Sequence, residues 1–166
     1  MAGKSAPITR TTEASNDLTA SDDAGSFNLA FAPGHLLRRN DQRATEIFQK
    51  HVGSSLTRQQ FALLVALREK GGAAQKDLVD FTGIDKSTTK EMLGRMVARG
   101  WVERQRCADD RRAWTMSLTP EGVRVLSENK HKATLAQSEI LKPLTPEQRR
   151  TFIAYLRLLL EAPAEE

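Results

Sequence analysis

Two short helical patterns separated by a tight turn constrain the fold of this chain more than any other feature. Residues 75–81 carry apolar side chains at helical spacing, and Gly83 follows where a left-handed helix cap belongs. Asp85 is then placed to cap a second helix, whose apolar face continues until Gly100. A short helix, a glycine-containing turn and another helix predict a helix-turn-helix.

The segment after this pair is typical of a charged β-hairpin. Residues 101–106 and 113–118 alternate well enough to form two strands, and C-A-D-D-R-R lies between them as the loop. A helix-turn-helix followed by such a hairpin has the outline of a winged helix. We expect the inner face of its second helix to consist of Thr89, Met92, Leu93, Met96 and Val97.

Helical patterns flank this unit on both sides, so the predicted class is mainly α with a small β-hairpin. One helix is expected over residues 34–52, and another begins after Thr57, which forms a capping-box pattern with Gln60. Thr119 and Thr145, each followed by proline, begin two more helices. The last helix is apolar over more than one stripe, which fits either a core helix or a subunit interface.

Positive charge is concentrated in the middle of the chain. The net charge is +4, and residues 86–112 hold eight basic residues against four acidic ones. Such a local excess is the electrostatic footprint of a protein that binds a polyanion.

The outward residues of the second helix suit contact with DNA. Near its start, short hydroxyl groups stand between lysines, which fits base edges and phosphates in a major groove. The start of the preceding helix offers further groups for phosphate contact. The expected DNA-binding residues in these two helices are Gln75, Lys76, Lys86, Ser87, Thr88, Lys90 and Arg95.

Several motifs in this order resemble the MarR (multiple antibiotic resistance regulator) family of winged helix-turn-helix transcription regulators. The matching stretches are L-T-R-Q-Q-F-A-L-L from Leu56, K-D-L-V-D-F-T-G-I-D-K-S-T-T from Lys76, L-G-R-M-V-A-R-G-W-V-E-R from Leu93, and D-R-R with S-L-T-P-E-G from Asp110 to Gly122. The resemblance covers about residues 34–160. It implies an intertwined helical homodimer on double-stranded DNA, with a recognition helix in each of two major grooves.

The resemblance also implies a domain organisation and two further sites. Residues 34–54 and 119–160 would form the dimerisation region and residues 55–118 the DNA-binding lobe, while the small, polar residues 1–26 are expected to be a disordered arm. The family's Asp-x-Arg wing pattern falls on Asp110, Arg111 and Arg112: Arg112 would enter the minor groove, braced by Asp110. A small-molecule effector, often an aromatic acid, would bind near His35, Arg38 and Arg39.

Other functional classes find little support in the sequence. Cys107 is the only cysteine, so an internal disulfide is excluded, and we interpret it as a passive strand-end residue, with a reactive thiol beside arginines as the alternative. The three histidines lack metal-ligand spacing, and no nucleophile and base can be paired, so neither a metal, a cofactor nor enzymatic activity is expected. The chain has no signal-peptide pattern and no long apolar run, which predicts a cytoplasmic protein.

These observations predict a sequence-specific transcription regulator, a repressor that a small aromatic acid or its conjugate releases from a pseudo-palindromic operator. Two alternatives remain open. One is a ligand-independent architectural DNA-binding protein, which would bind scrambled DNA equally well. The other is a winged helix that binds protein, in which replacing Arg112 and Lys90 would matter little.

Overall fold

The structure, a computed structural model, describes residues 27–106 and 114–161. The chain divides into two compact units, residues 1–39 and residues 40–166. Within the first unit, a 3-10 helix η1 (Leu29–Phe31) begins where the Asn28 side chain accepts a hydrogen bond from the Ala30 amide at 3.0 Å. The helix α1 (Pro33–Val52) begins in this unit and continues into the second.

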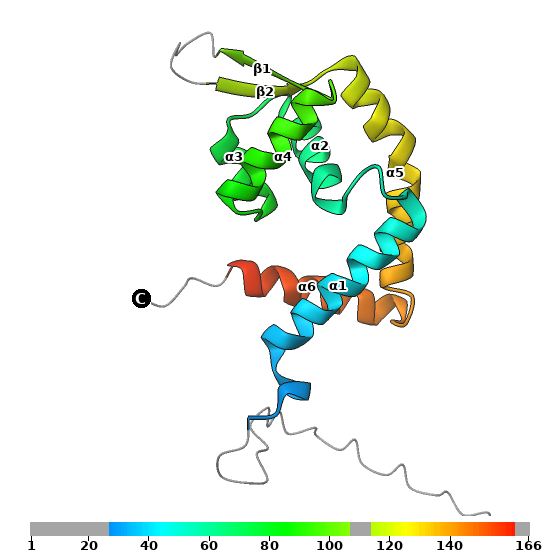
Figure 1. The fold of residues 1–166 in the computed structure, drawn as a ribbon. Helices are drawn as coiled ribbons and strands as arrows, with labels where there is room; N and C mark the ends of the chain where they lie inside the picture. The colour runs from blue at the N-terminus through cyan, green and yellow to red at the C-terminus, as the bar shows by residue number, and fades with distance from the viewer. Residues whose placement is uncertain (1–26, 107–113, 162–166) are drawn as a thin grey trace, which may run out of the picture. The chain divides into compact units, whose positions relative to one another are not determined.

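The second unit contains a winged helix (Figure 1), as the sequence predicted. Its strands pair antiparallel, with Val102 opposite Leu118 and Arg106 opposite Trp114. The elements after α1 are α2 (Arg58–Lys70), α3 (Gln75–Thr82), α4 (Lys86–Ala98), β1 (Val102–Arg106), β2 (Trp114–Leu118), α5 (Pro120–Ile140) and α6 (Pro146–Glu161).

The helix boundaries follow the capping signals in the sequence. The Thr57 hydroxyl accepts from the Gln60 amide, and the Gln60 side chain accepts from the Thr57 amide, both at 3.1 Å. The helix α3 ends at Gly83, whose φ of 68° is a left-handed conformation that glycine adopts without steric cost. Local sequence therefore determines where α2 begins and where α3 ends.

One apolar core joins the helices to the hairpin. Leu63, Leu64 and Leu67 of α2 are fully buried because they follow one face of the helix. The expected inner face of α4 is correct for Thr89, Met92, Leu93 and Met96 but wrong for Val97, which is 39% exposed. The core also contains Leu78 of α3, Val102 of β1, Met116 of β2, and Val125 and Leu126 of α5.

Two backbone hydrogen bonds join the turn after α2 to the strand β2. The Ala73 amide donates to the Met116 carbonyl at 3.0 Å, and the Met116 amide donates to the Ala73 carbonyl at 2.8 Å. The turn after α2 thus pairs with β2 like a very short third strand. A single residue pair carries no alternating pattern, so the sequence did not predict it.

The last helix leaves its apolar side chains uncovered. No residue of α6 is buried, and Leu159 and Leu160 are 66% and 86% exposed. None of the helices within residues 27–106 and 114–161 is long and apolar enough to cross a membrane.

A charged cluster ties the end of α1 to the end of α5. Glu139 accepts from the Lys50 ammonium at 2.9 Å and contacts Nε2 of His51 at 2.6 Å. Hydrogen bonds from Lys50, and then from His51, lower the pKa of the Glu139 carboxyl below its ordinary value of 4.5.

This lowered pKa predicts a pH-dependent contribution to stability. The ionised carboxylate stabilises the fold above the unfolded-state pKa of 4.5, and the contribution is lost as pH falls through the lower folded-state pKa. Thermal unfolding from about pH 6 to about pH 3 should therefore show a shallower loss of melting temperature in Glu139→Gln than in the wild type. Glu69→Gln, an exposed glutamate of α2, serves as the control and should follow the wild-type curve; identical curves for Glu139→Gln and the wild type would refute the prediction.

Candidate nucleic-acid interface and adjoining pocket

The start of α4 is held by its own cap. A carboxylate oxygen of Asp85 accepts from the Thr88 amide at 2.9 Å. Hydrogen bonds from the Thr88 side chain and backbone lower the pKa of Asp85, so this carboxylate stays ionised at neutral pH. The capped turn fixes the direction of the side chains that follow it.

Most of the α4 residues that were predicted to contact DNA lie on the exposed side of the helix. Lys86, Ser87, Lys90 and Arg95 are exposed, while Thr88 is half-buried. Arg95 forms an ion pair with Glu91 one turn earlier, so its charge is partly compensated. The lysines and Ser87 remain the most available groups of the predicted set.

Some groups at the start of α3 that were predicted to contact phosphate already have partners within the protein. The Gln75 side chain donates to the Lys86 carbonyl at 3.1 Å and so links α3 to α4. The Asp77 carboxylate accepts from the Ala74 amide at 3.2 Å, so this amide already has a partner at the helix start. Lys76 is exposed. Of the two residues proposed for phosphate contact here, Lys76 has the freer side chain.

The hairpin places arginine and tryptophan side chains together. Arg104 and Arg106 are exposed on β1, and their guanidinium carbons lie 3.8 and 5.2 Å from the centre of a Trp114 ring. These arginines were not among the predicted site residues, although the alternation of β1 places both on one strand face. Asp110, Arg111, Arg112 and Cys107 lie outside the described residues.

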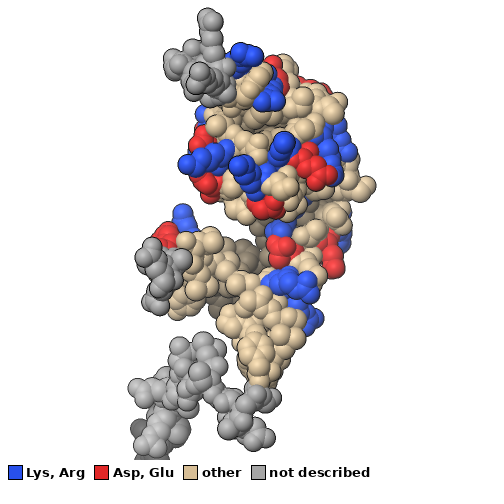
Figure 2. All heavy atoms as spheres, turned by 60° about the vertical axis from the view of Figure 1, so that its left-hand side comes forward, with Lys and Arg blue, Asp and Glu red and all other residues tan. Residues whose placement is uncertain are grey.

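Figure 2 shows how charge is distributed over the face that carries α3 and α4. Lysine and arginine side chains gather beside the hairpin and across the middle of this face, and acidic side chains lie between them. The surface is therefore mixed, with local basic groups, and not uniformly positive.

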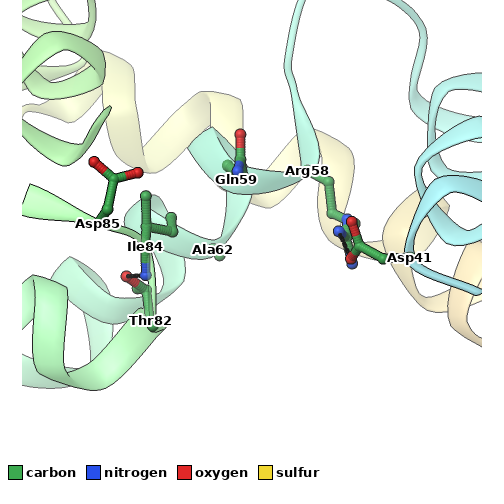
Figure 3. A pocket seen from close by; sticks show the side chains of 8 residues that line it. Asp41, Arg58, Gln59, Ala62, Thr82, Ile84 and Asp85 are labelled. Carbon is green, nitrogen blue, oxygen red and sulfur yellow. Dashed lines mark hydrogen bonds and ion pairs between the residues drawn. The ribbon is translucent and has the colours of Figure 1, made fainter. Parts of the chain in front are cut away.

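A pocket of about 460 Å³ adjoins the helix-turn-helix (Figure 3). An ion pair between Arg58 and Asp41 stands at one side, and Asp85 stands at the other. The Arg58 Nε atom is buried and has no hydrogen-bond partner among the described residues. The pocket is lined by Asp41 of α1, by Arg58, Gln59 and Ala62 of α2, and by Thr82, Gly83, Ile84 and Asp85 of the turn into α4.

The pocket differs from the predicted ligand cluster. His35 is half-buried and Arg38 and Arg39 are exposed in the first turns of α1, within the unit of residues 1–39. All pocket residues lie between Asp41 and Asp85. Arg58 has the guanidinium charge predicted for the effector site at Arg38 and Arg39, together with an unpartnered Nε donor. Arg58 was not predicted as a ligand-binding residue because it lies within the capping box of Thr57 and Gln60, which already accounted for this stretch of sequence.

No group of three histidine, cysteine, aspartate or glutamate side chains suited to hold a metal ion occurs in the part of the chain that the structure describes. The described residues provide exposed positive side chains on α4 and the hairpin and a buried hydrogen-bond donor, Arg58 Nε, at the pocket.

Comparison with known proteins gives consistent matches. The family model described as the MarR family matches residues 54–113. The transcriptional regulator HosA of Escherichia coli O157:H7 is 33% identical over 80% of this chain and 96% of HosA. The transcriptional repressor NicR of Pseudomonas putida is 35% identical over 63% of this chain and 66% of NicR, just under two thirds of its length.

A solved structure shows similarity over most of the chain. BpsR of Bordetella bronchiseptica, whose DNA binding is regulated by 6-hydroxynicotinic acid, superposes with a TM-score of 0.79. It is 33% identical, and the match covers 84% of this chain and all of BpsR.

Proposed function

The chain belongs to the MarR family of transcription regulators, and from this premise we propose that it is a cytoplasmic repressor that binds a pseudo-palindromic operator as a homodimer and is released by a small aromatic acid. The observation that carries the DNA-binding part is the capped, exposed first turn of α4, with Lys86, Ser87 and Lys90 facing outward. Short polar side chains between lysines suit base edges and neighbouring phosphates in a major groove.

Exposed apolar surface supports the homodimer. Tyr155, Leu158, Leu159 and Leu160 of α6 are each more than 60% exposed. A helix with this much uncovered apolar surface is unusual in a stable monomer, and a second copy offers a matching surface through two-fold symmetry.

The pocket supports an acidic effector. Its size falls within the range of small-molecule sites, and the buried Arg58 Nε needs an acceptor. A carboxylate on a planar ring provides that acceptor and suits the guanidinium plane. BpsR is regulated by such an acid, which favours the same chemical class here.

The position of the pocket suggests how release would work. It is lined by α1, by α2 and by the turn that ends in Asp85, the residue that caps α4. A ligand that moves this turn changes the direction of α4. Coupling of this kind typically lowers affinity by about 1 to 3 kcal/mol.

Hydroxyl-radical footprinting on the protein's own promoter region tests the dimeric mode. We expect two protected segments about 10 base pairs apart, because two-fold related recognition helices meet successive major grooves. A single protected segment would argue against the symmetric dimer. Protection that persists at saturating concentrations of aromatic acids and their coenzyme A thioesters would argue against the effector.

Arg112→Ala tests the predicted minor-groove contact. We expect a loss of about 1 to 3 kcal/mol in operator binding, concentrated on sites with an A·T-rich minor groove, where the negative potential is strongest. Binding titrations on A·T-rich and G·C-rich flanks measure it. An equal loss on both flanks would make Arg112 an ordinary phosphate contact.

A further inference from the structure

The two faces of the hairpin have different chemistry. Cross-strand pairing places Arg104 opposite Met116 and Arg106 opposite Trp114, so these four side chains share one face. On the other face, the Glu103 carboxylate accepts from the Gln105 side-chain Nε2 at 2.9 Å and from the Ser117 hydroxyl at 3.4 Å. The acidic side chain of β1 is therefore turned away from its two arginines.

The arginines stack on one tryptophan. The Arg104 guanidinium carbon lies 3.8 Å from the centre of a Trp114 ring, which is close enough for strong cation–π contact, and Arg106 approaches the ring at 5.2 Å. Trp114 itself is 38% exposed. A stacked guanidinium uses its flat face, so the N–H donors around its edge stay available for an acceptor.

Two other arginines of the lobe, Arg95 and Arg99, already have partners. Arg95 pairs with Glu91, and Arg99 donates to the Ser55 carbonyl at 2.8 Å. Within residues 27–106 and 114–161, no carboxylate forms an ion pair with Arg104 or Arg106. The hairpin thus presents two oriented cations whose charge and edge donors are uncompensated by the described residues.

We propose that Arg104 and Arg106 bind DNA phosphates and that Trp114 is the positioning residue that holds them for this contact. The inference rests on the proposed function and adds contacts at the base of the hairpin, apart from the predicted set at Asp110 to Arg112. Stacking restricts two long side chains before DNA arrives, which reduces the conformational entropy lost on binding. The expected acceptor is a phosphate oxygen and not a base edge. Contacts with phosphates orient a protein on DNA and do not depend on the base sequence.

The salt dependence of duplex binding tests the proposal. Arg104→Gln should reduce the slope of log affinity against log salt concentration by about 1, on promoter and scrambled duplexes alike. Trp114→Ala removes no charge, yet it should weaken binding by about fivefold and also reduce the slope, because the arginines lose their support. Trp114→Phe should keep most of the affinity. Arg124→Gln in α5 is the matched control and should leave the slope unchanged, because Glu121 and Glu128 already pair with that arginine.

An unchanged slope in Arg104→Gln would overturn the phosphate contact. Wild-type affinity and slope in a folded Trp114→Ala would overturn the positioning role. Failure of the proposed function looks different: the wild type would then bind promoter and scrambled duplexes equally, whatever the hairpin variants do.

A spectroscopic measurement covers the case in which Trp114→Ala fails to fold. Trp101 and Trp114 are the two tryptophans of the chain, so Trp101→Phe leaves Trp114 as the single tryptophan whose fluorescence is followed. Adding duplex should reduce the quenching of Trp114 by acrylamide, since bound phosphates would cover the arginines on its ring. Unchanged quenching at saturating duplex would overturn the proposal.

Discussion

A Gly122→Ala protein is expected to lose about 3 kcal/mol of unfolding free energy, at the upper end of what overpacking costs. Gly122 lies in the first turn of α5, where its amide donates to the Thr119 hydroxyl at 3.0 Å. A Cβ atom on this residue would lie 2.0 Å from the Trp101 carbonyl oxygen and 2.9 Å from the carbonyl carbon. Both are backbone atoms, so relief requires α5 to move away from the hairpin.

Such a movement would also break the contacts that join α5 to the lobe. The Thr119 amide donates to the Trp101 carbonyl at 3.1 Å, and the Thr119 hydroxyl donates to the Gly100 carbonyl at 2.6 Å. The cost should therefore appear as loss of cooperative unfolding stability and not as a local change.

Gly94→Ala provides the matched control for this measurement. Gly94 lies inside α4, and a Cβ atom there meets nothing within 4 Å. Alanine should stabilise the helix by about 0.5 to 1 kcal/mol because glycine has the more flexible unfolded chain. Urea unfolding of both variants tests the pair. Equal stability of Gly122→Ala and wild type would show that α5 does not pack against Trp101 as described.

The second large effect is expected in the affinity of the protein for its proposed effector. Arg58→Gln should weaken binding of an aromatic acid by about 10- to 100-fold, because a charge-assisted hydrogen bond to a carboxylate contributes about 1.5 to 3 kcal/mol. Operator affinity without effector should change little, since Arg58 lies in the pocket and apart from the exposed residues of α4. Calorimetric titration with hydroxynicotinic and hydroxybenzoic acids measures the first effect, and operator titration measures the second.

Replacing Asp41 should have the opposite effect on the affinity for an aromatic acid. Its carboxylate already pairs with Arg58, so an effector carboxylate must compete with it. Asp41→Asn should therefore strengthen binding of an anionic acid while Arg58→Gln weakens it. If both variants bind the acid as the wild type does, the effector occupies another site.

Local signals explain how much of the fold the sequence predicts. Three helix ends are determined by hydrogen bonds within a few residues, at Thr57 with Gln60, at Gly83 and at Asp85. The local order of residues is therefore enough to locate them. Val97 shows the limit of helical periodicity. It falls on the apolar side of α4 by spacing, but it lies at the edge of the buried stripe that Thr89, Leu93 and Met96 define, so the core covers it only in part.

Features made by distant residues escape sequence reasoning. Asp41 and Arg58 meet across 17 positions, and His51 and Glu139 across 88, with no periodic pattern to announce either contact. The pocket is made by three separate elements, so its lining was not predictable. The exposed set on α4 was predictable because helix geometry alone separates it from the core. Its contact with DNA, like that of Arg112, stays a prediction.

We expect the protein to prefer one DNA sequence and to lose that preference when an effector binds. The most direct test of this expectation is an anisotropy titration of the full chain with a duplex from its own promoter and with a scrambled duplex, at about 150 mM salt, where electrostatic binding is reduced. We predict at least a roughly thousandfold preference for the promoter duplex, with the bound fraction falling when an aromatic acid is added. Equal affinity for the two duplexes would contradict the account.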